Sequence, residues 1–128
     1  HPHLPILMLI TSLVFAPTAF AQKKLDIIQI MGQFVQANHA ASKCIKPDQS
    51  TLSKFLGNFH LVTVRAAEEM KKRKPDLTDQ QISEKFKTAS DAVAKQIDDL
   101  IRVNGCSDPR IQDLLKRFEV QANLKFGG

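Results

Sequence analysis

The stretch that decides the predicted fold runs from Thr78 to Cys106 and reads TDQQISEKFKTASDAVAKQIDDLIRVNGC. Its apolar residues recur at steps of three, four and one, which places them on one stripe of a helix. They are Ile82, Phe86, Ala89, Val93, Ile97, Leu100 and Ile101. Charged residues occupy the opposite face, and no proline interrupts the run. The sequence therefore predicts one long amphipathic helix, around which we expect the other helices to be organised.

Signals at both ends of this stretch agree with its periodicity. Thr78 and Gln81 have the spacing of a capping box, in which each side chain bonds the backbone N–H of the other residue. At the far end, Asn104 and Gly105 tolerate the backbone conformations that terminate a helix, and Pro109 follows shortly after. We therefore expect the helix to begin at Thr78 and to end close to Cys106.

Three further helices are predicted from the same kind of pattern, over residues 25–45, 52–74 and 109–124. Asp48 and Ser50 are both candidate N-caps for the second helix, and Asp108 with Pro109 opens the last one. β-branched residues never alternate over a useful length, so strands are not expected. The predicted fold class is all-α, a four-helix up-down-up-down bundle with short connections.

Length and charge limit the classes of protein to which this chain can belong. Its 128 residues suit one domain, and its formal net charge is +5. A basic balance of this size fits a protein near anionic lipid or glycan as well as a nucleic-acid binder. Binders of single-stranded nucleic acid interleave aromatic with basic residues, which this sequence does not do. No nucleic-acid partner is therefore predicted.

The first 21 residues have the order of a secretory signal peptide. Residues 4–16 form an apolar run, followed by Pro17 and the small-residue pattern Ala19-Phe20-Ala21. As a helix, the run would span about 20 Å, against about 30 Å of membrane hydrocarbon. We interpret residues 1–21 as a signal peptide and residues 22–128 as one periplasmic or secreted helical domain. The alternatives are an uncleaved anchor and an ordinary buried helix.

The two cysteines, Cys44 and Cys106, predict one disulfide, because paired cysteines in an exported protein usually form one. Cys44 closes the first predicted helix and Cys106 closes the third. In an up-down-up-down bundle these two helices end at the same pole, so the two residues should be neighbours. A redox dithiol would favour C-x-x-C, and a zinc site would need more ligands at short spacing.

Catalytic and metal-binding patterns were sought and not found. The adjacent carboxylates of Asp98-Asp99, like those of Glu68-Glu69, point to different sides of a helix and do not converge. His39 and His60, with Met31, Met70 and Cys44, could in principle ligate a soft metal or haem. The histidines lie at the edges of apolar stripes and the methionines within them, which is typical of ordinary packing. We therefore predict no enzyme activity, no cofactor and no metal.

The densest charge in the chain is the basic run Lys71, Lys72, Arg73 and Lys74. Cations in the last turn of a helix complement the helix dipole, which is sufficient reason for their presence. The functional hypothesis is that the run is a docking patch for an acidic partner or for phospholipid headgroups.

Leu77, Thr78 and Gln81 fit the pattern L-T-x-x-Q, through which the chain resembles the small helical periplasmic chaperones typified by Spy and CpxP. Those proteins are exported, basic and all-helical. The resemblance implies a stress-related protein that binds unfolded clients or metals, often as a dimer. The pattern occurs once here and twice in Spy and CpxP, and a cysteine pair is not part of it.

The sequence predicts a small exported module that binds a protein partner in the cell envelope or outside the cell, without catalysis. It could act as a chaperone, an inhibitor-type immunity protein or an assembly factor. An anionic lipid surface and a second copy of the chain, as a homodimer, are further candidate partners. The alternative is a carrier of a small apolar ligand or lipid, in a cavity lined by Phe34, Phe55, Phe59, Phe86 and Phe118. Plain core packing would explain the same five residues.

Overall fold

The computed structural model describes residues 25–126, so the predicted signal peptide lies outside the described residues. The described part contains four α-helices and no strand. They are α2 (Ile27–Cys44), α3 (Gln49–Arg73), α4 (Asp79–Asn104) and α5 (Pro109–Ala122). The predicted all-helical fold is therefore confirmed. None of these helices is long and apolar enough to span a membrane.

Every helix begins at a side-chain cap that the sequence supplies. Asp48, rather than Ser50, caps α3, so that helix starts a turn earlier than its apolar stripe. The predicted capping box of α4 is confirmed: Thr78 Oγ1 accepts from the Gln81 amide at 3.1 Å. In return, Gln81 Oε1 accepts from the Thr78 amide at 2.8 Å. These bonds satisfy backbone donors that have no partner within the helix.

The cap of α5 carries an additional ion pair. Asp108 Oδ1 accepts from the Arg110 amide at 2.8 Å, and Arg110 Nη2 donates to Asp108 Oδ2 at 3.0 Å. The side-chain bonds from Arg110, with the backbone bond, lower the pKa of Asp108 from 3.8 to about 2. The Asp108 carboxyl is therefore charged in the folded protein even in mild acid.

We expect Asp108 to contribute to loss of stability in acid. Its pKa is lower when folded, so its contribution is complete above about pH 4 and disappears as the pH falls towards 2. In urea unfolding at a series of pH values, Asp108→Asn should flatten the dependence of the unfolding free energy in that window. The exposed Asp113, substituted in the same way, is the matched control, and the effect should be larger in Asp108→Asn. An unaltered slope in Asp108→Asn would contradict this assignment.

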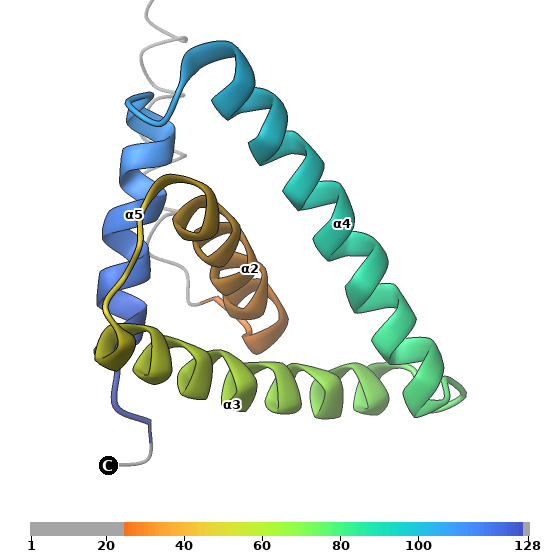
Figure 1. Cartoon of the computed structure of the whole chain (residues 1–128). Coiled ribbons are helices and arrows are strands. Elements are labelled where there is room, and N and C mark those ends of the chain that lie inside the picture. Colours follow the sequence, from red (N-terminus) through yellow and green to blue (C-terminus); the bar gives the residue numbers. More distant parts are fainter. Residues whose placement is uncertain (1–24, 127–128) are drawn as a thin grey trace, which may run out of the picture.

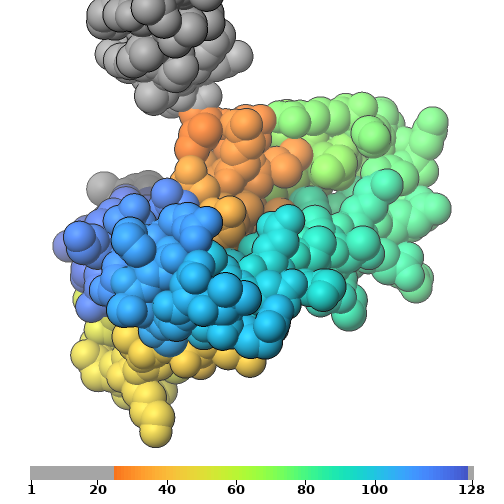
Figure 2. Space-filling model, turned by 90° about the horizontal axis from the view of Figure 1, so that it is seen from above, coloured from red at the N-terminus to blue at the C-terminus, as the bar shows by residue number. Residues whose placement is uncertain are grey.

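Helices α3, α4 and α5 follow the three sides of a triangle, with α2 inside it (Figure 1). Seen from above, the start of α2 (orange) and the start of α3 (yellow) lie on opposite faces of the molecule (Figure 2). Since α3 starts shortly after α2 ends, α2 crosses the triangle obliquely from one face towards the other. It packs against all three surrounding helices.

The hydrophobic core is organised around α2, which corrects the expectation that residues 78–106 form the central helix. Between residues 26 and 41 of the chain, only Gln29 is exposed. In the 26 residues of α4, by contrast, only Ile82 and Ile97 are buried. A strongly amphipathic pattern marks a helix with one buried face, whereas small and apolar residues on several sides mark an enclosed one.

The corner between α4 and α5 is held by the predicted disulfide. Cys44 and Cys106 are bonded, with 5.7 Å between their Cα atoms, although they are 62 residues apart in the sequence. Gly105 ends α4 with a φ of 80°, a conformation that favours glycine. The prediction that the first and third helices end at the same pole is therefore confirmed.

The corner between α5 and α3 is held by hydrogen bonds. Asn58 Nδ2 donates to the carbonyl oxygens of Gln121 at 2.8 Å and of Leu124 at 2.9 Å. Lys54 Nζ donates to Asn123 Oδ1 at 2.8 Å. Asn58 therefore satisfies backbone carbonyl groups at and just beyond the end of α5, and Lys54 adds a bond between side chains.

Candidate functional site: the groove between α3 and α4

The third corner, between α3 and α4, is fixed by the basic run. Lys71 Nζ donates to the carbonyl oxygen of Leu77 at 2.6 Å, across the turn that joins the two helices. Arg73 pairs with Glu69 at 3.0 Å on its own helix and with Asp26 at 3.5 Å at the start of α2. From this corner the two helices diverge (Figure 1).

A groove lies where α3 and α4 diverge, and it consists of two adjoining hollows of about 460 and 200 Å³. We call it the α3–α4 groove. Its apolar walls are Val64 and Ala67 from α3, with Ile82 and Phe86 from α4. Val64 is 41% exposed, a large fraction for an apolar side chain in a helix that packs on the core. Of these four side chains only Val64 is exposed; Ala67 and Phe86 are half-buried, and Ile82 is buried.

Charged groups stand at the edge of the groove nearest to the corner. Glu68 and Lys71 come from α3, and Asp79 comes from the first turn of α4. Lys71 Nζ is bonded to the carbonyl oxygen of Leu77 and lies 4.0 Å from Asp79 Oδ1. Two carboxylates and one engaged ammonium make this edge net negative, although the chain as a whole carries +5.

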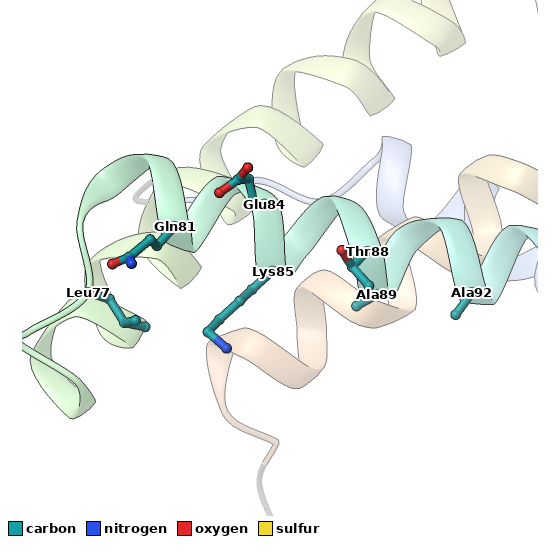
Figure 3. A pocket seen from close by; sticks show the side chains of 7 residues that line it. All are labelled: Leu77, Gln81, Glu84, Lys85, Thr88, Ala89 and Ala92. Atoms are coloured by element: carbon teal, nitrogen blue, oxygen red, sulfur yellow. The ribbon is translucent and has the colours of Figure 1, made fainter.

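Two other depressions in the described part of the chain are weaker candidates. One follows the outer side of α4, where Leu77, Gln81, Lys85 and Ala92 project from one side of the ribbon (Figure 3). Apart from Leu77 its walls are polar or small, and only α4 and that adjoining residue supply them. The other lies over the polar contacts between α3 and the end of α5.

All four residues of the basic run are exposed. Lys71 and Arg73 also make the contacts at the corner, whereas the side chains of Lys72 and Lys74 make no hydrogen bond or ion pair within the described residues. Glu69 and Asp26 further neutralise the charge beside Arg73. The docking patch stays a prediction, which now depends mainly on Lys72 and Lys74.

Four of the five phenylalanines of the carrier hypothesis pack against each other. Phe34, Phe55 and Phe118 are buried, and the centroids of the Phe55 and Phe118 rings are 4.3 Å apart. Phe59 joins them, at 5.8 Å from both Phe34 and Phe55. Phe86 of α4 packs against the same core cluster and lines the α3–α4 groove. Carriage of an apolar ligand stays a prediction, and it would require four of these rings to separate.

The two histidines considered as ligands line neither hollow of the α3–α4 groove. His39 Nε2 is 2.7 Å from Asp98 Oδ1, which ties α2 to α4. The hydrogen bond from His39 lowers the pKa of Asp98. His60 is exposed on α3. Within residues 25–126, no three His, Cys, Asp or Glu side chains gather in a way that could hold a metal ion.

No family model, curated protein or solved structure matches this chain. The resemblance to the small periplasmic chaperones therefore stays a hypothesis that depends on Leu77, Thr78 and Gln81. The structure gives two of these residues a local role, because Thr78 and Gln81 form the capping box of α4.

The sequence analysis missed Val64 and Ala67, which form the α3 wall of the groove. Val64 lies outside the buried stripe of α3, which contains Phe55, Val62 and Ala66. A second, weaker stripe along the same helix contains Leu56, His60, Val64 and Ala67, at steps of four, four and three. Such a stripe beside the main one would have indicated a second apolar face.

Proposed function

We propose that this chain is an exported, non-catalytic module that binds a protein partner through the α3–α4 groove. The observation that carries the proposal is the exposed Val64 of α3, which lines an open groove together with the half-buried Ala67 and Phe86. Ile82 and Phe86 also belong to the core face of α4, so the groove lies directly beside the core. An exposed apolar surface of this kind is typical of a site for another molecule.

Export is supported by two independent features. Residues 1–21 have the composition of a signal peptide, and Cys44 is bonded to Cys106. Structural disulfides persist in oxidising compartments and are rare in reducing ones. We therefore place the protein in the periplasm or outside the cell, where its partner would be another protein of the envelope or the surroundings.

Binding is tested by asking whether the full chain prevents aggregation of a reporter protein diluted from urea. No reductant is used, so the disulfide stays intact. The wild-type protein should lower light scattering in proportion to its concentration. Val64→Asp should lose most of this effect, because a charge in the groove cannot be desolvated without a partner.

The matched control is Val120→Asp, since Val120 is 61% exposed on α5 and lies outside the groove. It should retain the wild-type effect, and circular dichroism should show both variants folded. Equal loss in the two variants, or no suppression of aggregation by the wild type, would contradict the proposal.

A further inference from the structure

We propose that the α3–α4 groove takes an apolar polypeptide segment that carries lysine or arginine beside its apolar residues. This inference rests on the proposed function and adds the chemistry of the partner. The walls of the groove explain the apolar part, because Val64, Ala67 and Phe86 offer carbon atoms and no charge, while Ile82 beside them is buried. The carboxylates at the edge of the groove are the reason to expect a lysine or arginine in the partner segment.

Asp79 is the more accessible of the two carboxylates at this edge. Its side chain is fully exposed, and its ion pair with Lys71 is long, at 4.0 Å. The same ammonium has its short hydrogen bond, of 2.6 Å, to the carbonyl oxygen of Leu77. Lys71 is thus held at the turn, and Asp79 keeps oxygen atoms free to accept from an incoming cation.

Glu68 adds a second negative charge on the opposite wall. It is exposed, and it lines the same hollow as Asp79. A basic residue of the partner would therefore meet two carboxylates, whereas an acidic residue would be repelled by both.

Three synthetic peptides with one apolar core and lysine, glutamine or glutamate flanks would test this preference with the full chain. Fluorescence anisotropy measures the affinity of each labelled peptide. At low salt the lysine peptide should bind about three- to tenfold more tightly than the glutamate peptide, as expected for one or two exposed ion pairs. The difference should shrink at high salt, because salt screens exposed charges.

A double variant, Glu68→Gln with Asp79→Asn, should remove the difference between the lysine and glutamate peptides and leave the glutamine peptide unchanged. The matched control is Asp113→Asn with Glu119→Gln, two exposed residues of α5, and it should preserve the difference.

The outcomes separate this inference from the proposed function. Equal affinity for the lysine and glutamate peptides would overturn the inference alone, since the groove would still bind apolar segments. Failure of every peptide to bind would overturn both. A dimer in solution that Val64→Asp dissociates would also overturn it, because a second copy of the chain would then occupy the groove.

Discussion

Replacing Phe55 with alanine should lower the free energy of unfolding by about 3–5 kcal/mol, the usual cost of deleting a buried phenylalanine ring. Phe55 is fully buried, and its ring lies against Phe34, Phe59 and Phe118. It therefore joins α3 to α2 and α5 at one point. Domains of this size are stable by only about 5–15 kcal/mol, so the variant should be marginal at 37 °C.

Urea unfolding followed by circular dichroism would measure this effect. Leu56→Ala is the matched control, because Leu56 is the next residue of the same helix and is 46% exposed. It should cost much less than Phe55→Ala. If the two substitutions had equal effects, the core would not be centred on these rings.

Removing the disulfide should cost about 4 kcal/mol in the chain-entropy model, because the bond closes a long loop in the unfolded chain. Cys44 and Cys106 are 62 residues apart in sequence. The double variant Cys44→Ala with Cys106→Ala should unfold at a lower urea concentration than the oxidised protein. The reduced wild type should behave similarly.

The double variant provides its own control, since a reductant should not change its unfolding curve. Thiol titration of the untreated, denatured wild type should find no free thiol. If wild-type unfolding is unaffected by reductant, the bond between the corner of α4 and the end of α2 contributes little to stability.

The local features of the fold could be predicted from the sequence because short-range chemistry determines them. Thr78 with Gln81, and Asp108 with Pro109, mark helix starts whatever surrounds them. The disulfide could also be predicted, because short connections make the first and third helices end together. These arguments need only neighbours in the chain and the direction of each helix.

The packing order could not be predicted in the same way. The regular apolar stripe from Ile82 to Ile101 suggested a central helix. Such a stripe indicates that one face of the helix is buried, but it does not indicate how much of the helix surface other helices cover. The enclosure of α2 depends on Ala37, Ala40 and Ala41, whose small side chains let neighbouring helices approach. Alanine has no strong periodic signal of its own, so the sequence did not reveal this role.

The groove was missed because it depends on the angle between two helices. Val64 and Phe86 are 22 positions apart, and only the divergence of α3 and α4 leaves both beside an open hollow. The basic run was noticed because four cations adjoin in sequence. Their partners Leu77, Glu69 and Asp26 become apparent only after folding.

Helix α2 is enclosed by a frame of three helices, and of these α4 buries only Ile82 and Ile97. Amide hydrogen exchange of the oxidised protein, resolved by residue, tests this arrangement most directly. We expect the slowest exchange in α2, around Phe34 to Ala41, and clearly faster exchange along α4 between Glu84 and Ala92. If those amides of α4 were protected as strongly as α2, this arrangement would be contradicted, because α4 would then belong to the core.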